Sequence, residues 1–426
     1  TRSALMTGRH EFKNGITHTI LERERLTLKA TTIAQVLKSA GYATGIFGKW
    51  HLGDEAEYQP NRRGFDEVFI HGAGGIGQSY PGSCGDAPGN LYFDPTILHN
   101  GTFEKTQGYC TEVFFGQAMK WAGLVKDQPF FCYLPLNVVH APLQVSREDE
   151  ARYTNKVPDT NTAKYFGMCA NLDDHVGKLL NWLTARGLEK NTLVIYMNDN
   201  GGTGGVRVFN AGMHGAKGSP WNGGTRASSF WRWPGTLKPG DCGALTAHID
   251  FFPTLAEIAG AKLTPEASKQ VEGRSLVPLL ENPASAWADR TLFTHVGRWP
   301  RFSDPNLAKF KQCSVRSPQW HLVSIDGGAQ PKWQLFDMKA DYGEQHDVAA
   351  QHPIVVKQLG AAFDMFWSES LPLMVNEKAV GPKLNPFAEL YWKQFGGGPT
   401  PGDYERMDPL RPWPGPGEGK KKAKKK

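Results

Sequence analysis

Long apolar segments and paired cysteine motifs are both missing from this sequence. No window of about 18 residues is apolar throughout, so the chain contains no candidate membrane span. The six cysteines include no CxxC pair, which disfavours a zinc ribbon or a disulfide-built scaffold. One or two bridges stay open, for example around Cys84. The cysteines are Cys84, Cys110, Cys132, Cys169, Cys242 and Cys313.

An excess of positive charge is also missing from the body of the chain. The formal net charge is +6, but six of the 48 Lys and Arg residues lie within 420–426, and the other 42 equal the 42 Asp and Glu residues. The body is therefore neutral, and the composition predicts no nucleic-acid partner. The Pro-, Gly- and Lys-rich segment 401–426 is expected to be a flexible tail, with docking on an acidic polymer or a membrane surface as the alternative.

Helical and extended patterns alternate in the first two thirds of the chain. Helical patterns lie at 31–41, 112–125, 163–187 and 248–260, and buried-strand patterns lie at 42–48, 130–139 and 192–198. This alternation predicts an α/β fold with a large, mostly parallel sheet flanked by helices on both faces. In such sheets, ligands bind beyond the carboxyl ends of the strands.

From about residue 288 the pattern changes to short extended segments separated by turns. The segments lie at 290–296, 313–317, 320–325 and 332–338, and a helical pattern follows at 354–367. We therefore expect two domains: a large one over 1–287, and a smaller α+β domain over 288–400 built on a short antiparallel sheet.

Two motifs resemble binding sites but lack the context that such sites require. Residues 72–77 (GAGGIG) match GxGxxG, yet the QSYPGSCGDAPG that follows cannot open a helix, so we favour a loop lining a cleft over a nucleotide site. Asp173, Asp174 and His175 resemble a metal cluster. They lie in a helical pattern whose buried stripe is formed by other residues, so we expect them to face solvent or to make capping contacts. The stripe consists of Met168, Leu172, Val176, Leu179 and Leu183.

Polar side chains follow three of the predicted strands. Lys49 and His51 follow the first, His140 follows the second, and Asp199 and Asn200 follow the third. Because the carboxyl ends of parallel strands lie at one edge of a sheet, we expect these residues to converge. A Gly-Gly pair after the third strand breaks it, so both of its polar residues can turn hard oxygen ligands toward Ca²⁺ or Mg²⁺. A plain Asn-Gly turn is the alternative for that segment.

A second lysine is expected to join this group. Lys217 lies in the glycine-rich segment HGAKGSPWNGGTR (214–226), which can bring a flexible ammonium close to a ligand. Each of these cations taken alone could be an ordinary surface residue. Two lysines, two histidines and a divalent-cation motif at one end of one sheet together describe an anion site. Such a site can stabilise an oxyanion leaving a sulfuryl or phosphoryl centre.

These segments resemble the formylglycine-dependent sulfatases of the alkaline phosphatase superfamily, from Thr1 to about Pro353. TRSALMTGR at the start is similar to the end of the sulfatase signature. GIFGKWHLG, the His140-Ala141-Pro142 strand exit, NDNGG and GAKGSPWNGGTR match later motifs of the family in order. QLFDMKADYGEQHDVA (334–349) is similar to its closing motif, although Tyr342 stands where Pro is usual.

The resemblance implies a sulfuric ester hydrolase acting on an aryl or carbohydrate sulfate, with residues 1–287 as its catalytic domain. It implies that Arg2 holds the formylglycine hydroxyl, and that Lys49 contacts this group and the sulfate. His51 would be the base that frees sulfate in the second step. His140 and Lys217 would bind the sulfate oxygens and assist departure of the alcohol.

The resemblance also implies groups outside this sequence. The nucleophile, a Cys or Ser converted to formylglycine, is expected three positions before Thr1, and two metal-binding aspartates earlier still. Asp199 and Asn200 would supply two of four side-chain ligands to Ca²⁺, with Mg²⁺ as the alternative. The chain as given is therefore expected to be inactive. Family resemblance further implies an exported protein, whether periplasmic, extracellular or lysosomal.

Two other functions stay open at this point. One is a phosphodiester or phosphonate monoester hydrolase of the same superfamily, because its anion site differs only subtly. The other is an inactive relative that binds sulfated glycans, although a binding protein needs no base such as His51. Loops at 72–110 and 298–312 are expected to select the substrate alcohol. Tyr80, Trp221 and Trp299 are candidates either to stack on a sugar ring or merely to pack.

Overall fold

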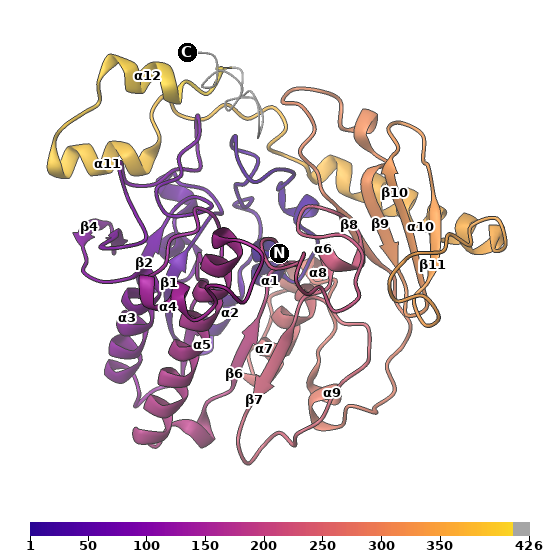
Figure 1. Cartoon of the computed structure of the whole chain (residues 1–426), viewed down its shortest axis with the longest axis horizontal. Coiled ribbons are helices and arrows are strands. Elements are labelled where there is room, and N and C mark those ends of the chain that lie inside the picture. The colour runs from indigo at the N-terminus through magenta and orange to yellow at the C-terminus, as the bar shows by residue number, and fades with distance from the viewer. Residues whose placement is uncertain (412–426) are drawn as a thin grey trace.

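The computed structural model describes residues 1–411, so the expectation of a flexible tail over 412–426 lies outside the described residues. A five-stranded sheet in the order β4-β3-β2-β1-β5 forms the centre of the larger part (Figure 1). Its strands are β1 (Ala43–Lys49), β2 (Glu67–His71), β3 (Thr96–His99), β4 (Thr102–Lys105) and β5 (Phe130–Tyr133). The neighbours β2, β1 and β5 run parallel, whereas β3 and β4 are antiparallel additions at one edge.

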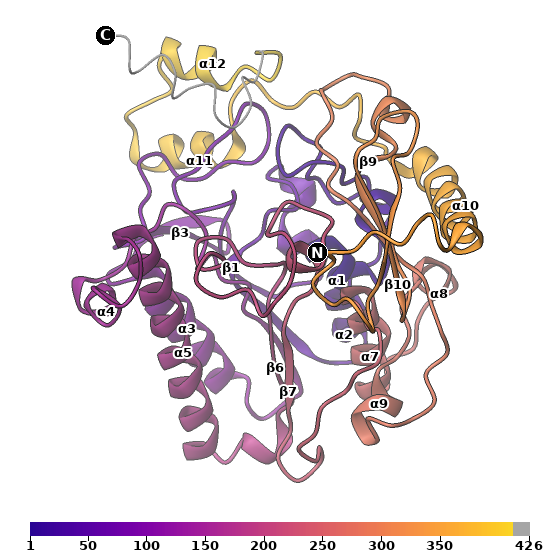
Figure 2. The same cartoon turned by 45° about the vertical axis from the view of Figure 1, so that its right-hand side comes forward.

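Helices cover both faces of this sheet, which confirms the predicted α/β class. Ile46 of β1 packs in a core with residues of α1 (Arg2–Thr7), α2 (Ile33–Ser39) and α7 (Phe251–Ile258). Its neighbour Phe47 points to the opposite face, because successive strand residues alternate, and packs with α3 (Cys110–Leu124) and α5 (Thr160–Ala185). Figure 2 shows α3 and α5 side by side, with α2 and α7 on the other side of the molecule.

The predicted strand at 192–198 forms, as β6 (Val194–Met197), but it does not join the five-stranded sheet. It pairs antiparallel with β7 (Ser229–Arg232) in a sheet of two strands. Within residues 1–411, β5 and β6 each have one strand neighbour, and all four residues of each are only partly buried. An apolar run predicts that a strand forms, but it does not specify the partner.

A second sheet forms the smaller part of the molecule, in the order β11-β10-β9-β8 with all pairs antiparallel. It is covered by α10 (Pro353–Ser370), whose Phe363 and Trp367 pack on Val315 and Leu322. The strands are β8 (Leu292–His295), β9 (Lys311–Arg316), β10 (Trp320–Asp326) and β11 (Gln334–Asp337). The predicted antiparallel sheet is confirmed, whereas the boundaries 288 and 400 stay predictions.

The last described elements return to the larger part. Figure 1 shows α11 (Pro386–Phe395) and α12 (Pro401–Met407) above β2 and β4, on the side opposite the second sheet. Gln394 of α11 accepts a hydrogen bond from the backbone N–H of Phe103 (2.8 Å) and donates one to its carbonyl (2.8 Å). The expectation that a flexible tail begins at residue 401 is wrong for Pro401–Met407, which form α12. Thr400 and Asp403 form a capping box there, and Met407 is buried.

The remaining helices are short. They are α4 (Arg147–Ala151), α6 (Asn222–Thr225), α8 (Pro265–Gln270) and α9 (Val277–Glu281), with 3₁₀ turns at Glu11–Asn14, Ala56–Tyr58, Pro60–Arg63, Glu189–Asn191, His248–Asp250, Pro305–Ala308 and Leu371–Leu373. Among the described helices, none is both long and apolar enough to span a bilayer. All six cysteines are free thiols, so the bridge left open at Cys84 does not form.

The structure confirms the expectation for the 72–77 motif, but only in part for the motif at 173–175. Residues 72–77 form a loop after β2 with no helix behind it, as expected. In α5, Asp173 and Asp174 are exposed, and Asp174 pairs with Arg152 (2.7 Å). His175 does not face solvent as expected: it is 4% exposed, and its Nδ1 lies 2.7 Å from the carbonyl of Asn171, one turn earlier. That hydrogen bond satisfies the ring inside the helix packing.

Candidate active site

Three of the predicted site segments follow strands, as expected, but the third strand, β6, lies outside the five-stranded sheet, so the expectation of one shared sheet end is wrong for Asp199. Lys49 is the last residue of β1, His140 lies in the loop after β5, and Asp199 follows β6. Arg2, in the first turn of α1, donates from Nη1 to the carbonyl of Lys49 (2.8 Å) and from Nη2 to that of Leu136 (3.5 Å). One guanidinium therefore joins the ends of β1 and the β5 loop.

Backbone contacts bring the segment of Lys217 to the same place. The Lys217 N–H donates to the carbonyl of Gly202 (3.0 Å), and the Thr1 hydroxyl donates to that of Asp199 (2.6 Å). A Cβ on Gly201 would lie 1.7 Å from the carbonyl oxygen of Gly223, so only glycine fits between these two loops. The glycines after β6 and in 214–226 thus allow the two loops to touch.

The charges of this group act on one another. Burial, and then the neighbouring charge of Arg2, lower the pKa of Lys49 to about 7, with Lys217 acting in the same direction. Burial also lowers the pKa of Lys217, which Asp199 partly offsets. Although burial opposes it, the charges of Arg2, Lys217 and Lys49 hold the pKa of Asp199 below its ordinary value. Three cations and one carboxylate therefore form a single electrostatic cluster.

His51 is held as a neutral ring in a defined tautomer. Its Nε2 lies 2.7 Å from the carbonyl of Thr19, so Nε2 carries the hydrogen and Nδ1 keeps its lone pair. Burial, and then the charge of Lys49, move the pKa of His51 well below its usual range. Its φ of 60° is uncommon for a residue other than glycine and fixes where the ring leaves the strand end.

His140 is also neutral, with the opposite nitrogen protonated. Its Nδ1 lies 2.7 Å from the carbonyl of Ala141, and the Tyr92 hydroxyl donates to the His140 carbonyl (2.9 Å). Burial and the charge of Lys49 lower the pKa of His140 to about 4. Nε2 therefore presents a lone pair, and it can donate a hydrogen bond only after taking up a proton. Gly74 and Gly75 of the 72–77 loop pack against this ring.

Asp199 and Asn200 offer oxygens of the type that Ca²⁺ prefers. Among residues 1–411, none donates a hydrogen bond to the Asp199 carboxylate, and the Asn200 amide N–H₂ donates to the carbonyl of Gly201 (3.0 Å), which leaves Oδ1 available. The donor chemistry fits a hard divalent cation. These two residues alone are an incomplete set of metal ligands. The described residues contain no cluster of three or more acidic, His or Cys side chains that could hold a metal.

One buried residue of this region was missed by the sequence analysis. His71 ends β2, directly beside Lys49 in the strand register, and is fully buried. Neither ring nitrogen has a hydrogen-bond partner among the described residues. Burial and the charge of Lys49 move the pKa of His71 well below its usual range, so it is neutral. In the sequence, only the position of His71 directly after the predicted strand EVFI could have indicated that it belongs to this region.

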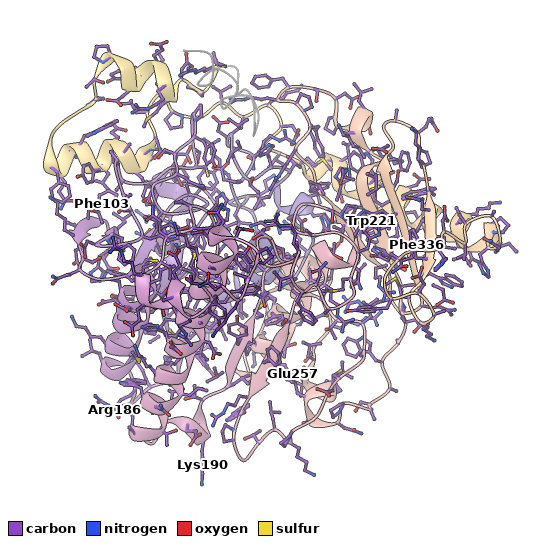
Figure 3. All side chains as sticks on the ribbon, viewed as in Figure 1. Phe103, Arg186, Lys190, Trp221, Glu257 and Phe336 are labelled. Carbon is purple, nitrogen blue, oxygen red and sulfur yellow. The ribbon has the colours of Figure 1, made fainter. Side chains whose placement is uncertain are left out.

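Two aromatic candidates for ring stacking are structural. Trp221 stacks on His214 (4.3 Å between ring centroids) and meets Phe336 edge-on (5.3 Å). Figure 3 labels Trp221 and Phe336 close to each other. Trp299 is 4% exposed, and its Nε1 donates to Glu377 (2.6 Å). Tyr80, which is half-buried, stays a candidate.

Comparison with known proteins identifies the family to which the chain belongs. A sulfatase family model matches residues 1–261, and a model of the C-terminal region of N-sulphoglucosamine sulphohydrolase matches residues 221–364. The chain belongs to the sulfatase family. Mouse arylsulfatase J is 26% identical over 428 residues, covering 91% of this chain and 70% of the relative. Human arylsulfatase A is 30% identical over 410 residues, covering 84% of this chain and 76% of the relative.

Solved structures agree with this assignment. The sulfatase chain resembles Ps i-CgsB, solved in complex with k-i-k-neocarrahexaose, with a TM-score of 0.70, 28% identity and coverage of 86% of this chain and 81% of the other. A phosphonate monoester hydrolase from Silicibacter pomeroyi reaches a TM-score of 0.56 at 18% identity and shares the fold alone. The protein is therefore a sulfuric ester hydrolase.

Proposed function

We propose that this sulfatase hydrolyses a carbohydrate or aryl sulfate in the site formed by Arg2, Lys49, His51, His140 and Lys217. The observation that carries the proposal is the set of hydrogen bonds that bring the segments of Arg2, Lys49, Asp199 and Lys217 together at the strand ends. The charges gathered there favour an anion whose negative charge increases as its ester bond breaks. A binding protein would need the cations but not the neutral base.

A formylglycine from a segment before Thr1, as in the family, would supply the oxygen that attacks sulfur. Arg2 is well placed to orient such a group, because its guanidinium is held by the carbonyls of Lys49 and Leu136. This bonding fixes the direction of the charge before substrate arrives. Pre-organised charge contributes more to rate than charge that must first be ordered.

Each remaining side chain has a distinct task. The ammonium groups of Lys49 and Lys217 would bind sulfate oxygens, and Nδ1 of His51 would accept a proton, since its Nε2 is already engaged with Thr19. His140 binds the sulfate with Nε2 only after protonation, which an incoming anion promotes. Lys217 is therefore the residue that supplies positive charge near the departing alcohol in the resting state.

Asp199 and Asn200 would hold Ca²⁺, or alternatively Mg²⁺, together with ligands from outside the described residues. The cation would add positive charge beside the sulfate. We also propose that the protein is exported, on family resemblance. The substrate class rests on the relatives, since arylsulfatases and a structure in complex with k-i-k-neocarrahexaose are among them.

The proposal is tested by assaying the full-length protein on nitrophenyl sulfate and on a matched nitrophenyl phosphodiester. We expect kcat/KM to favour the sulfate. Lys217→Ala should lower kcat/KM for the sulfate about 100-fold, the typical loss for one oxyanion-stabilising group. Lys190→Ala is the matched control: Lys190 is exposed in the Glu189–Asn191 turn, at the far end of the molecule in Figure 3. Preference for the phosphodiester would support the alternative hydrolase, and an unchanged K217A variant would remove Lys217 from the site.

A further inference from the structure

His71 is the buried neighbour of Lys49 in the five-stranded sheet. The two residues end β2 and β1 and are partners in the parallel register, which places their Cα atoms about 5 Å apart. The backbone continues this contact, because the N–H of Trp50 donates to the carbonyl of His71 (3.1 Å). Both residues are enclosed, since His71 is 0% exposed and Lys49 is 8% exposed. The imidazole and the ammonium therefore leave the sheet from adjacent buried positions.

The ring of His71 carries polar atoms that its surroundings do not use. It lies against Phe114 of α3, with 6.0 Å between the ring centroids, and neither ring nitrogen has a hydrogen-bond partner among residues 1–411. A neutral imidazole has one N–H donor and one lone pair, and burying both of them unpaired costs stability. A phenylalanine would fill such a place without that cost. The nitrogens therefore indicate a polar task at the strand end.

The ammonium of Lys49 has no acceptor of its own. Within the described part of the chain, no carboxylate pairs with Nζ and no acceptor takes a hydrogen bond from it. Arg2 and Lys217 lower the pKa of Lys49 as neighbouring cations, whereas Asp199 and the Cys84 thiol raise it. An ammonium has three N–H donors, and a neutral acceptor beside it would keep it charged without competing with an anion for the site.

The two other histidines of the site are already engaged. Nε2 of His51 and Nδ1 of His140 each lie 2.7 Å from a backbone carbonyl, and their second nitrogens have the proposed tasks of base and sulfate ligand. After burial, the charge of Lys49 is the largest influence on the pKa of His71, in agreement with the strand register. His71 is therefore the histidine that can offer a lone pair to Lys49 without giving up another contact.

We propose that His71 is a positioning residue for Lys49. The lone pair of its neutral ring accepts a hydrogen bond from the ammonium, directly or through one water. One N–H is thereby held toward β2, and the other two stay free for a sulfate. His71 itself touches neither the substrate nor a metal. The inference rests on the proposed function of Lys49 as a sulfate ligand.

The test compares His71→Gln with His71→Leu in the full-length protein, because Gln keeps an acceptor and Leu does not. NMR titration of protein with isotope-labelled lysines, in which the Lys49 signal is identified by its loss in Lys49→Met, follows the ammonium without any ligand. H71L should lower the pKa of Lys49 further, and H71Q should leave it close to that of the wild type. At pH 7, H71L should bind inorganic sulfate at least about tenfold more weakly, the effect of one hydrogen bond to a charged group, and H71Q should stay within about threefold.

His175→Leu is the matched control, because His175 is also buried, at 4% exposed, but lies in α5 and bonds the carbonyl of Asn171. It should lower the melting temperature and change neither the Lys49 titration nor the affinity for sulfate. If H71L does not fold, His71→Phe removes the acceptor and keeps a ring of similar size.

A purely structural His71 would behave like this control. A lower melting temperature with an unchanged Lys49 titration would therefore overturn the proposal, and so would equal effects of H71Q and H71L. A wild type whose Lys49 titration responds to H71L but which binds no sulfate would overturn the proposed function and support the contact between His71 and Lys49.

Discussion

At the scale of single residues, the proposed role of Lys49 in sulfate binding implies a dependence on pH. Burial and the charge of Arg2 lower the pKa of Lys49 to about 7, so the ammonium is partly deprotonated at neutral pH. A bound sulfate favours the charged form and so draws a proton from solution. The pKa of His140, lowered to about 4 by burial and Lys49, moves upward for the same reason.

We therefore expect the affinity for inorganic sulfate to fall as the pH rises above 7, approaching tenfold per unit because one proton is lost. Sulfate titration by calorimetry at pH 8, in two buffers of different ionisation enthalpy, should show uptake of nearly one proton. Lys49→Met should bind sulfate weakly and without this dependence. A dissociation constant that stays constant from pH 6.5 to pH 9 in the wild type would contradict the role of Lys49.

At the scale of single elements, the end of β1 depends on close contact with the segment after β5. Gly48 has φ of 132°, and a Cβ there would lie 2.5 Å from the carbonyl oxygen of Pro135. The same carbonyl accepts from the Lys49 N–H (2.7 Å). Any side chain at Gly48 must push the two segments apart next to Lys49, the last residue of the strand.

Gly48→Ala should consequently lower the free energy of unfolding by about 2 kcal/mol or more and weaken sulfate binding at least tenfold. Denaturant unfolding and sulfate titration measure the two effects. Gly116→Ala is the control, because Gly116 lies in α3 with nothing within 4 Å of the added Cβ. It should stabilise the helix by up to about 1 kcal/mol. Full sulfate affinity in G48A would show that the strand end tolerates the shift.

The elements also show what the sequence could predict. The helices α2, α3, α5, α7 and α10 and the strands β1, β5 and β6 follow from local periodicity. The strands β3, β4 and β7 were missed, because four-residue strands of mixed polarity carry little periodic signal. The pairing of β6 with β7 and the burial of His71 depend on neighbours far away in the sequence, so no local pattern could show them.

At the scale of the whole molecule, the smaller domain supports the loop of Lys217. Glu344, which is 2% exposed, accepts from the Asn222 N–H (2.8 Å) and pairs with His321 of β10. Its own carbonyl lies 3.2 Å from Nδ1 of His214. The segment 334–349 thus holds the 214–226 loop at His214 and at Asn222, on either side of Lys217.

Glu344→Ala should destabilise the fold by roughly 3 kcal/mol, because it leaves buried donors without an acceptor, and should also weaken sulfate binding by loosening the Lys217 loop. Thermal unfolding and sulfate titration below the unfolding temperature separate the two effects. Glu257→Ala, at an exposed position of α7 labelled in Figure 3, should change neither. A lower melting temperature with full sulfate affinity would limit Glu344 to a role in stability.

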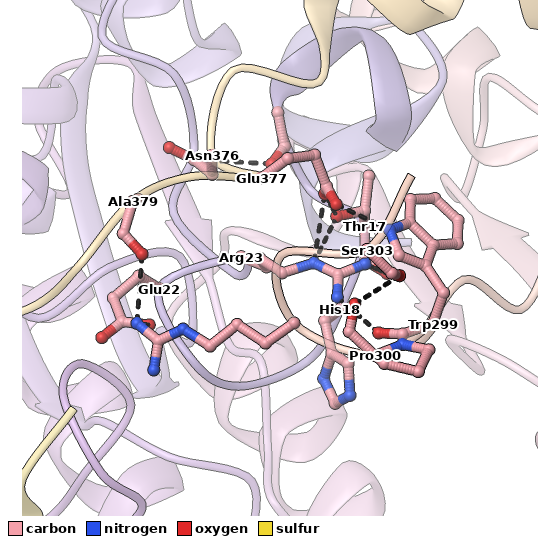
Figure 4. Close-up of polar contacts among 12 residues, drawn as sticks. Thr17, His18, Glu22, Arg23, Trp299, Pro300, Ser303, Asn376, Glu377 and Ala379 are labelled. Carbon is pink, nitrogen blue, oxygen red and sulfur yellow. Dashed lines mark hydrogen bonds and ion pairs between the residues drawn. The ribbon is translucent and has the colours of Figure 1, made fainter. Parts of the chain in front are cut away.

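The contacts of the segment around Glu377, which accepts a hydrogen bond from Trp299, also bear on how the protein is synthesised (Figure 4). Asn376 donates to the carbonyls of Gly15 (2.9 Å) and Arg25 (2.9 Å), and the next residue, Glu377, pairs with Arg23. Segments near residues 15–25 therefore stay without these partners until the ribosome has synthesised residues 376 and 377. Contacts of such long sequence separation form slowly. The proposed anion site should consequently be completed late, because Thr19, whose carbonyl bonds His51, lies in this segment.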